Sequence, residues 1–168
     1  MSETEYLAFI DPIKHKIFRL SKRFLVSVDE AEDATQDVLL KLWKNRKRLS
    51  TISKPEAFAM TITKNHCFDR LKSRQASNLK IIHSNFTGYE SLERRIENND
   101  SINLINKLIN LLPEKQRLVI QLRDIECYEF KEISEIIGLN ETAIRVTLSR
   151  ARKKLRNELI KLHNYGTQ

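Results

Sequence analysis

The chain has 168 residues, of which 40% are hydrophobic and 31% are charged, and its formal net charge is +8. The hydrophobic share allows compact cores in one domain or in two small ones. Glycine and proline are scarce and alternating β-branched runs are absent, which argues against a sheet protein and favours an all-α fold. The positive charge suits a polyanionic partner, although a merely soluble basic protein would share it.

Cysteine and histidine usage gives no sign of a metal site, a disulfide framework or a cofactor. Cys67 and Cys127 are the only cysteines, without a CxxC pair, and the four histidines are scattered. No long apolar run exists, and the N-terminus MSETEYLAFID is not a secretory signal. We therefore expect a cytoplasmic protein that does not itself bind a membrane.

Two amphipathic helices are predicted at the N-terminus. The first covers residues 5–25, where Pro12 introduces a kink or a separate first turn. The second begins at Asp29, a good N-cap with Glu32 three residues later, and ends near Asn45. Its buried stripe comprises Ala31, Ala34, Val38 and Leu42, with Leu39 beside it.

A basic, hydroxyl-rich break follows over residues 45–54, and Pro55 then starts a third helix that runs to about Gln75. The residues predicted to face inward are Phe58, Ile62, Cys67 or His66, Phe68 and Leu71. The residues predicted to face outward are Lys64, Asn65, Arg70, Lys72 and Arg74.

The composition of the chain changes over residues 76–103, where the helical periodicity of apolar residues is weak and the excess of basic residues disappears. Such a stretch is long for a loop within one compact domain, so it indicates a flexible linker, with a short helix near residues 92–96. We predict two small helical domains, residues 1–75 and 102–168, joined by a linker over residues 76–101.

The second helical set contains an amphipathic helix over residues 102–112 and another that starts at Pro113 and carries Leu118, Val119, Leu122 and Ile125. A helix-turn-helix then spans residues 130–156. Gly138 is suited to a left-handed C-cap, and Asn140 can cap the next helix. That helix has an apolar stripe at Ile144, Leu148, Ala151 and Leu155, and no acidic residue from 143 to 157.

A helix, a glycine turn and a helix with a cationic free face are typical of a DNA-reading motif. At 100° per residue, one face opposite the Ile144 stripe carries Thr142, Arg145, Val146, Ser149 and Lys153. Arg145 is our candidate for a bidentate guanine contact, with Val146 and Ser149 beside neighbouring bases. Arg150 and Arg152, at the flanks, are expected to bind phosphates.

Three segments resemble the extracytoplasmic-function group of bacterial RNA polymerase sigma factors. Residues 29–45 are similar to the region 2 helix that docks on the polymerase clamp, and residues 55–74 to the helix that reads the −10 element. Residues 112–156 are similar to region 4, which reads the −35 element. The chain departs from the family at Cys127, where glycine is usual, and at Thr61, where arginine is frequent.

The resemblance implies a non-enzymatic subunit that directs core polymerase to promoters and melts −10 DNA. Its implied partners are the polymerase clamp and flap, promoter DNA and a membrane-linked anti-sigma factor. The −35 contacts implied are Thr142, Arg145, Val146, Ser149, Arg150 and Lys153. The −10 contacts implied are Arg46, Lys64, Asn65, Arg70, Lys72 and Arg74. The polymerase contacts implied are Asp33, Gln36, Asp37 and Leu40.

Two other functions fit the residues less well. A stand-alone helix-turn-helix regulator would bind operator DNA, but it would leave the acidic strip on the second helix and the −10-like helix unexplained. An enzyme acting on nucleic acid would need an acid/base or metal constellation, and the sequence suggests none.

Overall fold

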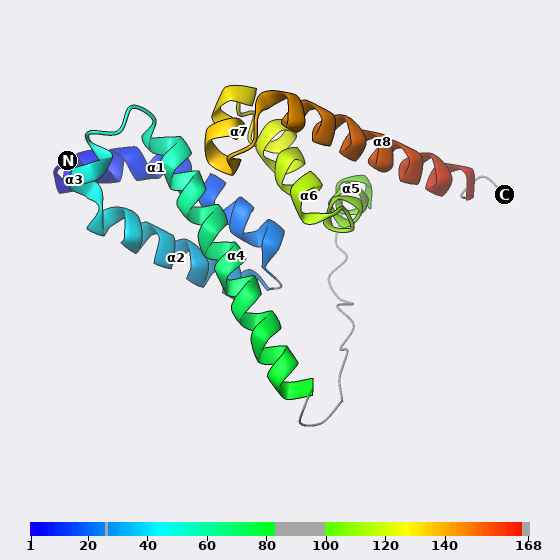
Figure 1. Cartoon of the computed structure of the whole chain (residues 1–168), viewed down its shortest axis with the longest axis horizontal. Helices are drawn as coiled ribbons and strands as arrows, with labels where there is room; N and C mark the ends of the chain where they lie inside the picture. Colours follow the sequence, from blue (N-terminus) through cyan, green and yellow to red (C-terminus); the bar gives the residue numbers. More distant parts are fainter. Residues whose placement is uncertain (26, 83–99, 166–168) are drawn as a thin grey trace. The chain divides into compact units, whose positions relative to one another are not determined.

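Every element in the described part of the chain is a helix, which confirms the predicted all-α fold (Figure 1). The computed structural model describes residues 1–25, 27–82 and 100–165, with side chains described through residue 74 and again from 102 to 162. The chain divides into two compact units, Met1–Glu90 and Ser91–Gln168. Each unit builds its own core, and each is described separately below.

The N-terminal unit contains α1 (Glu3–Phe24), α2 (Val28–Lys44), the short α3 (Arg46–Leu49) and α4 (Pro55–Ile82). Helix α1 is continuous through Pro12, so the separate first turn considered from the sequence does not occur. Helix α2 is capped by Ser27, whose hydroxyl accepts from the Glu30 backbone N–H (3.1 Å). The predicted cap at Asp29 is therefore wrong, because α2 already starts at Val28 and Asp29 lies within its first turn.

Helices α1, α2 and α4 pack on one another around a shared apolar core. The predicted stripe of α2 is confirmed, since Ala31, Ala34, Val38 and Leu42 are all fully buried. On α4 the prediction is partly wrong. Phe58 and Ile62 are only half-buried, whereas Met60 and Thr63 are fully buried.

The C-terminal unit contains α5 (Asp100–Asn110), α6 (Glu114–Ile120), the π-helical turn η1 (Gln121–Ile125), α7 (Phe130–Ile137) and α8 (Glu141–Tyr165). Its core includes the fully buried Val119, Leu122, Ile133 and Ile144. Helix α8 packs on both α6 and α7, so the three enclose one core.

The helix predicted to run on from Pro113 widens into a π turn at its end. The Glu126 backbone N–H donates to the Gln121 carbonyl (3.0 Å), and the buried Gln121 side chain donates to the Glu126 carboxylate (2.9 Å). Cys127 follows with a φ of 61°. Cys127 thus adopts the left-handed conformation that glycine favours.

Helix α4 continues to Ile82, so its predicted end near Gln75 is wrong. The short helix predicted near residues 92–96 lies outside the described residues. The domain limits 1–75, 76–101 and 102–168 stay predictions.

Candidate nucleic-acid interface

The helix-turn-helix has the geometry predicted from its turn residues. Helix α7 ends at Gly138, which has a φ of 73° and whose N–H donates to the Ser134 carbonyl (2.9 Å). A Cβ at Gly138 would meet no atom within 4 Å. The glycine is therefore required by its backbone angle and not by lack of space. Asn140 caps α8 by accepting from the Ala143 N–H (2.8 Å), as predicted.

Helix α8 is buried on one side and exposed on the other. Ile144, Leu148 and Ala151 are at most 3% exposed, which confirms these three positions of the predicted stripe, and its fourth residue, Leu155, is half-buried. The predicted DNA-facing residues are all exposed: Thr142, Arg145, Val146, Ser149, Arg150 and Lys153. The helix thus presents a cationic surface with one apolar residue, Val146, which is 44% exposed. Such a surface can bind phosphates through its cations and contact a thymine methyl through its valine.

Two arginines of α8 are bound to neighbours within their unit. The Arg145 guanidinium lies over the Phe130 ring, 3.8 Å from its centroid, and its Nη2 donates to Glu141 Oε2 (3.3 Å). Arg152 forms two hydrogen bonds with the Asp124 carboxylate, and these raise the pKa of Arg152. The geometry thus gives Arg152 a role in holding α8 against η1, and the phosphate contact predicted for it stays a prediction.

The −10 residues predicted on α4 fall into two groups. Asn65 and Lys72 are exposed and Lys64 is half-buried. Burial lowers the pKa of Lys64 below its usual 10.5. Arg70 and Arg74, in contrast, turn toward α2.

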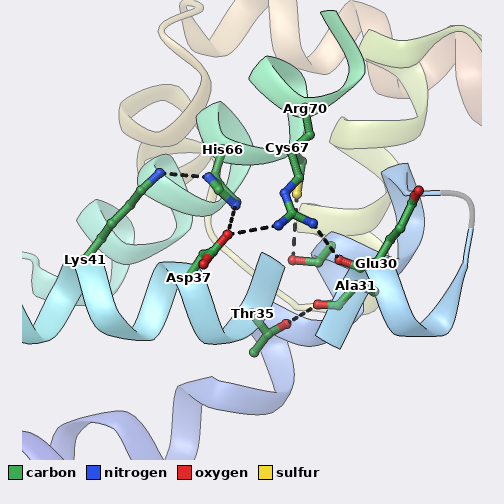
Figure 2. A network of polar contacts seen from close by, with 9 residues as sticks. Glu30, Ala31, Thr35, Asp37, Lys41, His66, Cys67 and Arg70 are labelled. Carbon is green, nitrogen blue, oxygen red and sulfur yellow. Dashed lines mark hydrogen bonds and ion pairs between the residues drawn. The ribbon is translucent and has the colours of Figure 1, made fainter. Parts of the chain in front are cut away.

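Figure 2 shows how α4 is tied to α2 by polar contacts. Arg70 donates from Nη2 to Asp37 Oδ2 (2.9 Å) and from Nη1 to the Glu30 backbone carbonyl (3.2 Å). One turn further on, Arg74 Nη1 lies 3.0 Å from Glu30 Oε1. Both arginines of α4 therefore bind the same side of α2, which carries Glu30 and Asp37.

His66 lies in the same network, between a cation and an anion of α2 (Figure 2). Its Nδ1 is 2.8 Å from Lys41 Nζ, and its Nε2 is 3.3 Å from Asp37 Oδ2. Burial, Lys41 and Arg70 lower the pKa of His66, against a weaker opposite effect of Asp37. A neutral imidazole fits these contacts, with Nδ1 accepting from Lys41 and the Nε2–H facing Asp37.

The residues predicted to bind polymerase line the outer side of α2. Asp33, Gln36 and Leu40 are exposed, and Leu40 is 51% exposed, which is high for a large apolar residue. Asp37 is half-buried because it also binds Arg70. Trp43, on the same helix, is half-buried: it packs edge-on against Tyr6, and the Arg46 guanidinium lies 4.2 Å from its ring centroid.

Sequence reasoning missed the partners of several candidates. Glu30, Lys41 and Phe130 were not singled out, although each contacts a predicted site residue. The Arg70–Asp37 pair joins residues 33 apart, and local spacing carries no signal for it. The 15-residue separation of Phe130 and Arg145 would have been accessible, since a glycine turn folds α8 back onto α7.

No group of three metal-binding side chains occurs among the described residues. None of the helices in the described part of the chain is both long and apolar enough to cross a membrane.

Comparison with known proteins gives a consistent result for both units. Residues 9–77 match the family described as sigma-70 region 2, and residues 102–155 match sigma-70 region 4. The ECF RNA polymerase sigma factor SigW of Bacillus subtilis is 26% identical over 163 residues, covering 89% of this chain and 86% of that protein. SigK of Mycobacterium tuberculosis is 22% identical over 161 residues, covering 92% and 86%.

Solved structures share the fold. The sigma factor RpoE of Bartonella quintana, in complex with the anti-sigma factor NepR, superimposes with a TM-score of 0.77 and 22% identity, over 94% of this chain and 97% of that one. CnrH, in complex with the cytosolic domain of CnrY, gives a TM-score of 0.67 and 18% identity, over 95% and 90%.

Proposed function

The chain belongs to the extracytoplasmic-function family of RNA polymerase sigma factors, and from this premise we propose which of its residues meet promoter DNA, polymerase and an inhibitor. As a sigma factor it is a non-enzymatic, DNA-binding protein of transcription initiation. A stand-alone helix-turn-helix regulator would leave the region 2 match over residues 9–77 without a role.

In this proposal α8 of the C-terminal unit reads the −35 element. The observation that carries the assignment is the exposed cationic face of α8, which stands on a buried apolar stripe and follows a glycine turn. Arg145, Val146 and Ser149 would contact base edges, because they lie near the middle of that face. Thr142, Arg150 and Lys153 would position the helix on the phosphates.

The N-terminal unit would capture the −10 element along α3 and α4. Asn65 is exposed and can hydrogen-bond a base that has left the stack, while Lys64 and Lys72 attract the backbone. Arg46, at the start of α3, lies over the Trp43 ring and would contact the adjacent DNA strand. Arg70 and Arg74 are also proposed backbone contacts, and DNA would have to share them with Asp37 and Glu30.

Core polymerase would bind the outer side of α2. Asp33, Gln36 and Asp37 offer acceptors to basic and polar groups of the clamp, and Leu40 offers apolar area. The C-terminal unit would rest near the polymerase flap. The structural neighbour RpoE is bound to the anti-sigma factor NepR, and CnrH is bound to the cytosolic domain of CnrY. By analogy, we propose a membrane-linked anti-sigma partner for this cytoplasmic chain.

Transcription in vitro tests the assignment. The chain is added to bacterial core polymerase on a genomic library, and start sites are mapped. We expect starts downstream of one shared pair of −35 and −10 motifs. Asp33→Lys should reduce capture of core polymerase, whereas Glu3→Lys, an equal charge change on α1, should not. Equal capture by both variants would remove Asp33 from the docking surface.

A further inference from the structure

Phe130, the first residue of α7, is the centre of a small cluster on the helix-turn-helix. The Arg145 guanidinium of α8 lies 3.8 Å from its ring centroid, and the Arg123 guanidinium of η1 lies 4.8 Å from it. Three consecutive helical elements therefore meet at one aromatic side chain. Such cation–π contacts are favourable, and arginine in particular stacks its plane on aromatic faces.

The ring is held in place by the start of α7. Glu129 and Glu132 form a capping box in which the Glu129 N–H donates to Glu132 Oε2 (2.8 Å). The Ile133 N–H donates to the Glu129 carbonyl (2.9 Å), and the Ile133 side chain is fully buried. These contacts fix the backbone on both sides of Phe130, so the ring can serve as a fixed support.

The two arginines at this ring have different freedom. Arg123 donates to the Tyr128 carbonyl (2.7 Å), pairs with Glu129 (3.4 Å), and has a side chain only 28% exposed. Arg145 has a side chain 58% exposed, and its recorded polar contact is the exposed Glu141 carboxylate one turn away. Arg123 is thus part of the fold, while Arg145 is available to an outside partner.

Stacking constrains an arginine without using its hydrogen-bond donors. The Arg145 Cζ lies over the ring, 3.8 Å from its centroid. In a guanidinium stacked by its face, the N–H groups lie in the guanidinium plane, where a base edge can accept from two of them. A side chain already held in the binding geometry loses less conformational freedom when DNA arrives. The exposed pair with Glu141 is weak and easily exchanged.

We propose that Phe130 is a positioning residue for promoter specificity, which holds Arg145 for bidentate recognition of one base pair of the −35 element. Phe130 acts through Arg145 and need not touch the base itself. This inference rests on the proposed function, in particular on Arg145 as a base-reading residue.

The test uses the full chain with core polymerase and promoters that differ only in the −35 element. Phe130→Leu and Phe130→Met keep an apolar side chain but remove the ring, Phe130→Tyr keeps the ring, and Arg145→Ala removes the proposed reader. Arg145→Ala should reduce discrimination at one base pair by about 5- to 150-fold. Phe130→Leu should reduce it at the same base pair by about 2- to 5-fold, and Phe130→Tyr should retain it.

The double variant separates positioning from a general structural role. With Arg145→Ala already present, Phe130→Leu should cause no further loss of discrimination. An equal loss in both backgrounds, or a uniform decrease on all promoters, would overturn the proposal, as would failure of both ring-deleting variants to fold. If Arg145→Ala leaves the −35 preference unchanged, the proposed base contact itself fails. If Arg145→Ala acts and Phe130→Leu does not, the positioning role alone fails.

Discussion

The cations of α4 and those of α8 are used in different ways. On α4, Arg70 (Figure 2) and Arg74 bind carboxylates and a carbonyl of α2, so they help to join two helices. On α8, the exposed residues proposed to contact DNA lie opposite a buried apolar stripe, in which Ile144 is fully buried. Ion pairs join α4 to α2 in the first case. In the second, the buried apolar residues hold α8 in place and leave Arg150 and Lys153 exposed, and Arg152 is the cation of α8 that pairs with η1. A basic surface is therefore not uniformly available to DNA.

The largest expected effect comes from removing the apolar support of α8. Ile144→Ala deletes a fully buried side chain and should lower the free energy of unfolding of the C-terminal unit by about 2–5 kcal/mol. Hydrogen exchange, read by segment, should show faster exchange in α6, α7 and α8 and unchanged exchange in α1, α2 and α4.

Val146→Ala is the matched control on the same helix. Val146 is 44% exposed, so its truncation should change the free energy of unfolding by less than about 0.5 kcal/mol. Equal destabilisation of both units by Ile144→Ala would show that they unfold as one cooperative body, which would contradict separate cores in the two units.

The next effect comes from breaking the polar tie between α2 and α4. Asp37→Asn leaves Arg70 and His66 without their shared carboxylate and should cost about 1 kcal/mol, since the site is half-exposed. Asp33→Asn, on the exposed side of the same helix, should cost almost nothing. Urea unfolding measures both, and equal stability of the two variants would contradict a joining role for Asp37.

A third effect concerns the salt dependence of promoter binding, which depends on the exposed cations that contact DNA phosphates. Lys153→Gln removes one exposed cation of α8, and the slope of log affinity against log salt for promoter binding by the polymerase complex should fall by about 0.9. Lys14→Gln on α1, where Lys14 pairs with Asp11 (2.6 Å), should leave the slope unchanged. A shift of equal size in both variants would mean that only overall charge matters.

The smallest effect is a pH dependence of the N-terminal unit. Burial, together with Lys41 and Arg70, lowers the pKa of His66 below its usual 6.5, while Asp37 opposes this. The unfolded chain then takes up this proton at a higher pH than the folded chain does. Stability should be complete above pH 6.5 and fall as the pH drops from there toward the folded-state pKa.

Urea unfolding between about pH 5 and 8 measures this dependence. His66→Gln should flatten that part of the curve, because glutamine does not titrate in the range. A curve unchanged by the substitution would assign the pH dependence to another group.

The helices and the reading face were predictable because their signals are local. Gly138 and Asn140 define a turn through backbone angle and side-chain capping, and both behave as predicted. The buried stripe of α8 follows from helical spacing. These features depend on residues within a few turns of one another, so the sequence order reveals them directly.

What could not be predicted depends on packing between distant segments. Met60 and Thr63 are more deeply buried than the predicted Phe58 and Ile62, because the positions of α1 and α2 decide which side of α4 is covered. The Arg70–Asp37 pair has the same origin. Charged residues on an amphipathic helix look equally free in a sequence, and only the neighbouring helix determines which of them are engaged.

The turn at Cys127 has a practical consequence. The chain has two cysteines, and Cys67 is buried while Cys127 is exposed. Burial also raises the pKa of the Cys67 thiol, which makes it still less nucleophilic. A maleimide dye should therefore label the native protein at one position, just before the helix-turn-helix. The natural sequence thus provides an attachment point for fluorescence measurements of promoter engagement without any engineered cysteine.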